Sequence, residues 1–138
     1  MSTETVFSIA NILVMPMWVL MIFLPNWKWT TWLVDFKLVP IILALIYAVY
    51  ITIAVSGGSE MDFSSLESVM NLFKDEQAVL AGWVHYLVFD LLVGMWCMNQ
   101  NKSIGINSIL MGVCLLGCFM LGPIGFLLFL VFKRIKQS

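Results

Sequence analysis

The sequence predicts an all-α integral membrane protein, a four-helix bundle with a short amphipathic helix between the second and third spans. Of 138 residues, 62% are hydrophobic and only 11% are charged, and the apolar residues fall into four long blocks. A soluble domain carries about 25% charged residues, so this chain has too little polar surface to coat a water-soluble fold. At roughly 20 residues per span there is room for four crossings, and residues 1–138 are expected to form a single transmembrane domain.

The first span is expected at about residues 6–24. The preceding MSTET lacks the basic flank and the small-residue cleavage site of a secretory signal, so we expect this span to stay uncleaved. Pro16 lies mid-span, where membrane helices tolerate a kink, and Pro25 ends the block. The segment NWKWTTW that follows gathers three tryptophans and a lysine, which is typical of an interfacial belt.

The second span, at about residues 33–55, opens with Asp35 and Lys37, which are expected to reach the interface or to pair with each other. The polar connection 56–77 is predicted to contain a short amphipathic helix on the membrane surface or over the bundle. Ser64 and Glu67 fit a capping box there. Apolar residues recur at helical spacing in this connection at Phe63, Leu66, Met70 and Phe73.

The third span is expected at about residues 78–98 and the fourth at about 107–132. Within the fourth, Pro123 between two nearby glycines predicts a break or kink. Small residues repeat every four positions along it, which favours close helix packing; they are Ser108, Gly112, Cys114, Cys118 and Gly122.

Several classes of function find no support in the composition. The net charge is −1 without a clustered basic face, so we expect no nucleic-acid binding. Cys97, Cys114 and Cys118 show no CxxC spacing and predict neither a disulfide framework nor a zinc site. One histidine with these cysteines is too few ligands for a haem or metal centre, and no GxSxG elbow is present. We expect no cofactor.

Asp90 is the strongest candidate functional residue, because it lies deep in the third apolar block, where a charge is expensive. His85 lies about 140° away around the helix, so the two are not on one stripe, although both would border one cavity if this helix is central. Trp83, Tyr86 and Asp90 share a face, and Tyr86 is placed to hydrogen-bond Asp90.

Structural roles remain open for the same residues. A protonated Asp90 could tie two helices together, and a lone histidine such as His85 is often a satisfied core or interface group. Asn11 in the first span, with Tyr47 and Tyr50 in the second, either face a ligand or bond to neighbouring helices.

The string SSLESVMNLF, followed by AGWVHYLVFDLLVGMW, resembles the abscisic-acid-deficient-four-like membrane family, whose plant members are associated with neoxanthin synthesis in the plastid. The resemblance extends over nearly the whole chain, with a basic residue of many members replaced by Met95. Other matching positions are Ala10, Asn11, Leu24, Pro25, Trp27, Pro40, Tyr47, Gly122, Pro123 and Gly125, and those of the core motif are Gly82, Trp83, His85, Tyr86, Leu87, Phe89, Asp90, Leu91, Val93 and Gly94.

The resemblance implies a cofactor-free isomerase acting on a carotenoid or another isoprenoid. Forming an allenic alcohol from an epoxy-carotenoid requires protonation of the epoxide oxygen and removal of a ring-adjacent proton, both favoured in a dry site. Asp90 would be the acid and His85 the base, with Tyr86 as the third catalytic candidate. The expected substrate-binding residues are Asn11, Tyr47, Trp83, Phe89, Gly94 and Trp96.

Two other functions are compatible with the sequence. The chain could bind an isoprenoid or assist assembly of a membrane complex without catalysis, with His85 and Asp90 fixing helix packing. A proton-coupled carrier would normally need more intramembrane ionisable residues than one helix supplies. The oligomeric state is open.

The absence of a plastid transit peptide suggests a bacterial inner (cytoplasmic) membrane protein in contact with membrane lipid. Four spans would place both termini and the long connection on one side. The basic KRIK sequence near the C-terminus favours the cytoplasm for that side. This arrangement sets Lys74, Lys133, Arg134 and Lys136 against Lys28, Lys37 and Lys102.

Overall fold

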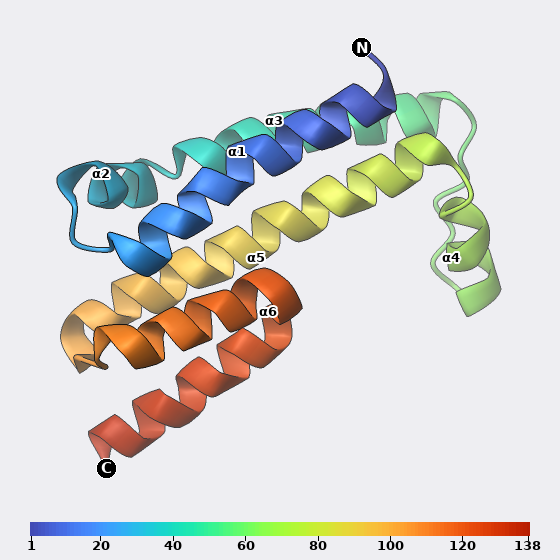
Figure 1. Cartoon of the computed structure of the whole chain (residues 1–138). Coiled ribbons are helices and arrows are strands. Elements are labelled where there is room, and N and C mark those ends of the chain that lie inside the picture. The colour runs from blue at the N-terminus through green and yellow to red at the C-terminus, as the bar shows by residue number, and fades with distance from the viewer.

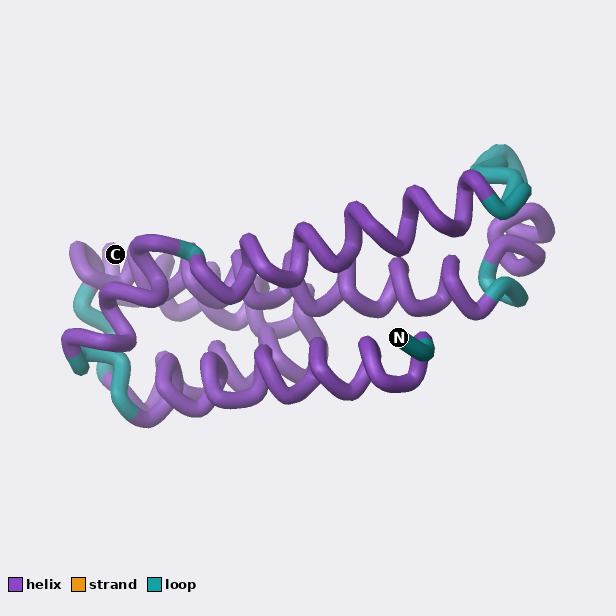
Figure 2. Tube along the Cα trace, turned by 90° about the horizontal axis from the view of Figure 1, so that it is seen from above, coloured by secondary structure: helices purple, strands orange, loops and turns teal.

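The computed structural model describes residues 1–138 as six helices without strands. Four helical segments are long and apolar enough to cross a membrane, which confirms the predicted all-α fold and its four apolar segments. Figures 1 and 2 show an elongated bundle with α2 and α4 at opposite ends. The helices are α1 (Thr3–Phe23), α2 (Lys28–Phe36), α3 (Leu38–Ser56), α4 (Leu66–Leu72), α5 (Glu76–Ile104) and α6 (Ser108–Gln137).

The second apolar segment is interrupted near its start, which the sequence did not predict. Helix α2 ends at Phe36, and α3 begins after Lys37, whose φ of 53° is in the left-handed region. Pro40 explains the break, because in a continuous helix its ring would clash with the carbonyl of Phe36 four residues earlier. The interfacial tryptophan segment therefore becomes a separate short helix at the end of the bundle.

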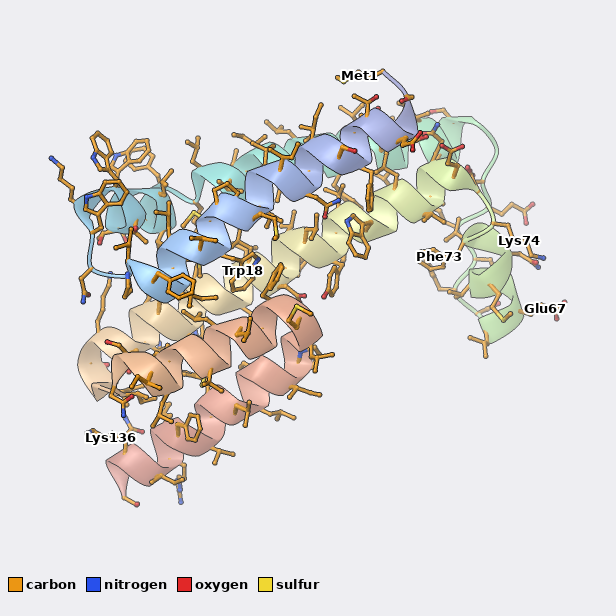
Figure 3. All side chains as sticks on the ribbon, in the orientation of Figure 1. Met1, Trp18, Glu67, Phe73, Lys74 and Lys136 are labelled. Atoms are coloured by element: carbon orange, nitrogen blue, oxygen red, sulfur yellow. The ribbon has the colours of Figure 1, made fainter.

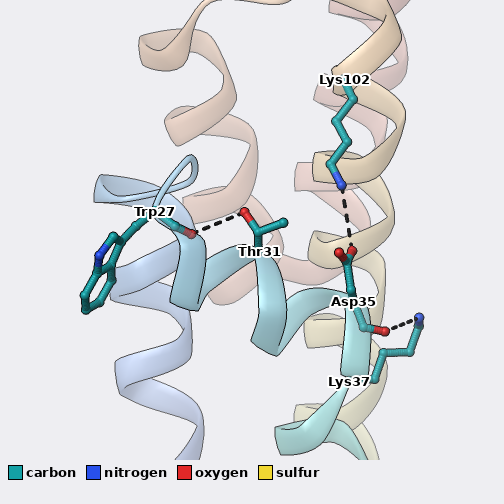
Figure 4. Close-up of polar contacts among 5 residues, drawn as sticks. All are labelled: Trp27, Thr31, Asp35, Lys37 and Lys102. Atoms are coloured by element: carbon teal, nitrogen blue, oxygen red, sulfur yellow. Dashed lines mark hydrogen bonds and ion pairs between the residues drawn. The ribbon is translucent and has the colours of Figure 1, made fainter.

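Polar contacts hold α2 against the end of α5 (Figure 4). The Asp35 carboxylate pairs with Lys102 Nζ at 3.7 Å, whereas Lys37 Nζ donates to the backbone carbonyl of Asp35 at 3.5 Å. Of the two alternatives expected for Asp35 and Lys37, pairing of their side chains is wrong, because the carboxylate turns toward α5 instead. Since both members of the 3.7 Å pair are largely exposed, it orients α2 more than it stabilises the fold.

The predicted amphipathic helix in the long connection is α4, and its cap lies one residue later than expected. Ser65 Oγ, not Ser64, accepts from the backbone N–H of Ser68 at 3.1 Å. Phe73 then packs on Gly82 of α5 so closely that a Cβ at Gly82 would lie 2.8 Å from Phe73 Cε1. Helix α4 is thus fastened to the beginning of α5.

Helix α5 is the central helix, because it contacts α1, α3 and α6. It begins after Asp75, which accepts from the backbone N–H of Gln77 at 2.9 Å and from the Ser59 hydroxyl. It ends at Gly105, where Asn101 exchanges two hydrogen bonds with the backbone of Ile106. The helix therefore continues well past residue 98, the predicted end of the third span.

Helix α6 is broken in its middle, as predicted near Pro123, and the chain reverses direction at the break. Leu121 and Gly122 have non-helical backbone angles, and the chain after them returns alongside the chain before them (Figure 1). Pro123 accounts for the break, since it has no N–H and its ring excludes the carbonyl four residues earlier. The two halves touch at Gly125, where a Cβ would overlap the backbone between Gly117 and Cys118.

This reversal changes the position of the C-terminus. The chain ends at the same end of the bundle as α2, opposite α4, and the N-terminus lies toward the α4 end (Figures 1 and 3). The two termini therefore lie toward opposite ends of the bundle, whereas the four full crossings expected from the sequence would place both on one side. Lys133 confirms the new placement by donating to Gln100 near the end of α5 at 3.2 Å.

We predict that the substitution Gly125→Ala destabilises the protein, whereas Gly112→Ala in the same helix does not. The first methyl group would overlap backbone atoms that cannot move aside, and overpacking of this kind costs about 1–3 kcal/mol or more. The second would lie 3.8 Å from Ile22 Cγ2, an ordinary contact. Thermal unfolding in mild detergent measures both, and equal melting temperatures would contradict the reversal of α6.

We also predict that acid loosens the start of α5. Hydrogen bonds from the Ser59 side chain and the Gln77 N–H lower the pKa of Asp75 below its ordinary value of 3.8. A carboxyl with a depressed folded-state pKa stabilises the fold above that ordinary value, and its contribution is lost as the pH falls through the folded pKa. Amide exchange over residues 76–79, corrected for its intrinsic pH dependence, should quicken below about pH 3.8. An Asp75→Ala variant should lack this transition; the same transition in both proteins would refute the assignment.

Candidate functional site

The reversal of α6 leaves one side of α5 uncovered over the N-terminal half of that helix. The turn at Leu121–Gly122 lies beside Asp90, and α6 reaches no farther toward α4 (Figure 1). Trp83, Tyr86 and Phe89 are 38%, 36% and 55% exposed, even though they lie well inside an apolar span. We call this surface the open face; its α5 residues are Trp83, His85, Tyr86, Phe89 and Asp90.

Asp90 lies at the inner end of the open face, against the turn of α6. A Cβ at Gly122 would overlap its carboxylate, so only glycine permits this approach. Asp90 Oδ2 is buried and has no hydrogen-bond partner. The turn that Asp90 touches comes directly before Pro123, where the second half of α6 starts. Asp90 is therefore placed both to hold the turn and to offer a carboxyl oxygen at mid-depth.

Tyr86 contacts the same turn one helical turn earlier on α5. Its hydroxyl donates to the backbone carbonyl of Phe119 at 3.4 Å. This is the carbonyl that Pro123 leaves without its usual helical donor. The side chains of Tyr86 and Asp90 neighbour each other, but the Tyr86 hydroxyl donates to Phe119 and not to Asp90 as the sequence predicted.

Helix α1 borders the open face on one side, and a row of aromatic rings lies along this border. Trp83 Nε1 donates to Asn11 Oδ1 at 3.3 Å, and the Trp83 ring lies 5.5 Å from Phe7 and 5.4 Å from Tyr86. Asn11 also donates to the Phe7 carbonyl at 2.8 Å. Asn11 and Trp83, predicted as binding residues, are thus brought together across 72 positions of sequence.

The opposite border of the open face is formed by α3. The His85 ring meets Tyr47 edge-on at 5.4 Å and lies 4.7 Å from Phe89. His85 and Asp90 consequently face different neighbours, α3 and α6, with Phe89 and Tyr86 between them around α5. The two candidate catalytic groups border one exposed arc without contacting each other.

Two predicted binding residues lie away from the open face. Gly94 is covered by Trp18 of α1, whose ring would be 2.7 Å from a Cβ at that position. Trp96 packs against Phe126 and Phe129 in the returning half of α6, at 5.8 and 5.6 Å. Both belong to the half of α5 that α6 covers, where they contribute to packing, although Trp96 itself is 40% exposed.

A groove extends the open face toward the α4 end of the bundle. It has a volume of about 460 Å³, and its apolar lining comes from Phe7, Val79, Leu80 and Trp83. Glu4 and Glu76 border it at the helix starts. From Glu76 to Asp90 the helix rises about 21 Å, so groove and open face together form a path through roughly half of a bilayer.

Sequence reasoning missed the parts of this site that come from other helices. Phe7 and Phe119 were not identified, because nothing local distinguishes them from other apolar residues of their spans. Pro123 was the available signal for Phe119, since a proline frees the carbonyl four residues earlier. No group of three or more histidine, cysteine or acidic side chains is placed to hold a metal ion. The three cysteines are buried and free.

The comparisons with known proteins give one match. A family model described as ABA4-like, ABA DEFICIENT 4-like, matches residues 5–129 and so includes the open face and the turn of α6. No curated protein and no solved structure was found to match the chain. The family match covers most of the sequence and agrees with the resemblance seen in the motif around His85 and Asp90. This membrane protein belongs to the ABA DEFICIENT 4-like family.

Proposed function

We propose that this protein is a cofactor-free isomerase that takes a carotenoid or another isoprenoid from the bilayer onto the open face of α5. The single observation that carries the proposal is the open face itself, where ionisable and aromatic side chains are exposed at the depth of the hydrocarbon. Charged or polar groups at that depth are expensive and usually functional. A ligand supplied by the lipid phase needs a lateral opening of this kind.

Binding is supported by the aromatic lining. The rings of Phe7, Trp83, Tyr86 and Phe89 provide a long apolar surface on which a polyene chain would lie. The groove of about 460 Å³ continues this surface toward the membrane boundary. The oxygenated end of the ligand would then meet Asp90 at mid-depth, and its chain would run toward the α4 end.

The chemistry needs one acid and one base that touch different atoms of the ligand. Protonated Asp90 gives its proton to the epoxide oxygen, the carbon–oxygen bond breaks, and the oxygen becomes a hydroxyl. Neutral His85 removes a proton from a neighbouring carbon, and the freed electron pair forms the new double bond. Atoms and electrons balance without an oxidant, and passing the proton from His85 back to Asp90 resets the site.

The positions of the two groups suit this division of work. His85 and Asp90 are about 7.5 Å apart along the helix axis and about 140° apart around it, so they do not pair directly with each other. Tyr86 lies between them in angle and next to Asp90, where its hydroxyl oxygen, while donating to Phe119, can still accept the proton of the carboxyl group. We also propose the bacterial inner membrane as the location.

A second function is favoured by a specific contact, that of Asp90 with Gly122. If Asp90 serves only to hold the turn of α6, the open face binds an isoprenoid without converting it. The ligand would be the same in both cases, so the two functions differ in turnover and not in binding.

We predict that Asp90→Asn and His85→Ala each lower the rate of isomerisation by about 10²–10⁴-fold, the usual contribution of a general acid or base. Conversion of an epoxy-carotenoid by the purified protein, followed by chromatography of the pigments, measures this rate. Asp35→Asn is the matched control, because it removes a carboxylate that lies outside the site and pairs with Lys102 on the surface. Folded variants that keep the full rate would show the catalytic assignment to be wrong. A wild-type protein that retains the ligand without converting it would instead support the binding function.

We predict further that Trp83→Ala lowers the amount of isoprenoid that co-purifies in mild detergent severalfold. Trp83 of α5 contacts the α1 border of the open face, and stacking on it is lost in this variant. Trp29→Ala in α2 is the control, since that ring lies at the far end of the bundle. Absorbance and mass of the extracted molecule identify it, and equal yields from both variants would argue against ligand binding at the open face.

A further inference from the structure

The reversal of α6 sorts almost all charges of the chain to the two ends of the bundle. The C-terminal tail returns to the end where α2 and the end of α5 lie (Figures 1 and 3). Six of the seven basic residues are consequently at that end, which we call the basic end, with Asp35 as its single acidic residue. The six are Lys28, Lys37, Lys102, Lys133, Arg134 and Lys136.

The other end carries the opposite charge, and we call it the acidic end. Lys74 is its single basic residue, and Asp90 lies at the middle of α5, between the two ends. Helix α4 and the connection before it supply most of the acidic residues of this end. They are Glu4, Glu60, Asp62, Glu67, Asp75 and Glu76.

Tryptophans mark the basic end as a membrane boundary. Trp27, Trp29 and Trp32 are 46%, 53% and 43% exposed around α2, and indole rings prefer the headgroup region. Lys28 Nζ lies 5.5 Å from the centre of the Trp29 ring, so the ammonium group is held at the same level. The basic residues are thus placed at headgroup depth and not farther out in water.

A cavity of about 200 Å³ opens at the basic end between α1, α5 and the beginning of α6. Polar groups of Asn26, Lys102 and Ser108 line it, together with apolar side chains of Met21, Met111 and Leu115. Lys102 also reaches Asp35 at 3.7 Å, an exposed pair that leaves the ammonium accessible. A lining that combines a cationic amine with an apolar wall fits a phosphate headgroup and the start of its acyl chains.

We propose that the basic end binds anionic phospholipid headgroups and faces the cytoplasm, so that the acidic end, α4 and the N-terminus lie on the opposite side of the membrane. Basic residues near an anionic membrane surface attract it, and an excess of Lys and Arg marks cytoplasmic segments. This inference does not depend on catalysis at the open face.

The lipid preference is tested by fluorescence quenching. The protein is reconstituted in vesicles of phosphatidylcholine and phosphatidylglycerol, with bromine on the acyl chains of one lipid at a time. We expect brominated phosphatidylglycerol to quench the wild-type tryptophans more strongly than brominated phosphatidylcholine. In a variant with Lys102→Gln, Arg134→Gln and Lys136→Gln, the preference for phosphatidylglycerol over phosphatidylcholine should fall by about fivefold for each charge removed.

Lys74→Gln is the matched control, because it removes the one basic residue of the acidic end, and it should keep the wild-type preference. The preference should also weaken at high salt, as expected for headgroup charges. Equal quenching by the two lipids in the wild type, or an unchanged preference in the triple variant, would overturn the proposed binding surface.

The orientation is tested with two added cysteines, Met61→Cys in the acidic connection and Ser138→Cys at the end of the tail. The three natural cysteines are 0% exposed and give little background. In intact bacterial cells a membrane-impermeant maleimide should label Met61→Cys and should label Ser138→Cys only after permeabilisation. Labelling of both from one side, or the reverse pattern, would refute the orientation.

Discussion

A backbone carbonyl inside a lipid bilayer has no water to bond with, so every break in a helix needs a donor from elsewhere in the protein. Pro123 creates such a break by leaving Phe119 without its intrahelical donor. The Tyr86 hydroxyl, from α5, takes the place of the missing donor at 3.4 Å. A backbone group left unsatisfied in hydrocarbon costs several kcal/mol, which is a large part of the stability of a small fold. The shape of α6 is therefore maintained by a residue of another helix.

The geometry of the remaining site follows from this constraint. Once α6 turns back at Gly122, the N-terminal half of α5 loses the cover that a straight helix would give it. Residues such as Trp83 and Phe89 are then exposed at hydrocarbon depth, although the same helix is closely packed farther along, where Gly94 admits Trp18. Helix α5 thus has one uncovered side in the half before Asp90 and is packed in the half after it. The aspartate lies at this boundary because the turn approaches its carboxylate.

Hydropathy was sufficient to predict the four apolar segments, since their composition alone makes water an unsuitable solvent. The motif around His85 and Asp90 was also sufficient to identify the family and most α5 residues of the open face. The reversal of α6 was not predictable in the same way, because a kink and a full turn differ only in the backbone angles of Leu121 and Gly122. Gly117 and Gly125 lie four residues to either side of Leu121, and this symmetry permits the two halves to touch. The predicted roles of Gly94 and Trp96 required knowing which half of α5 is covered, and no local pattern shows that.

The return of α6 also bears on how the chain enters the bilayer. The KRIK sequence comes back to the side from which α6 entered, so these cations never have to be translocated across hydrocarbon. A straight α6 would require that translocation during synthesis, at a stage when no folded neighbour can shield the charges. The turn at Gly122 therefore determines the side of the membrane on which the tail ends. A nascent chain that did not turn there would have a different number of membrane crossings.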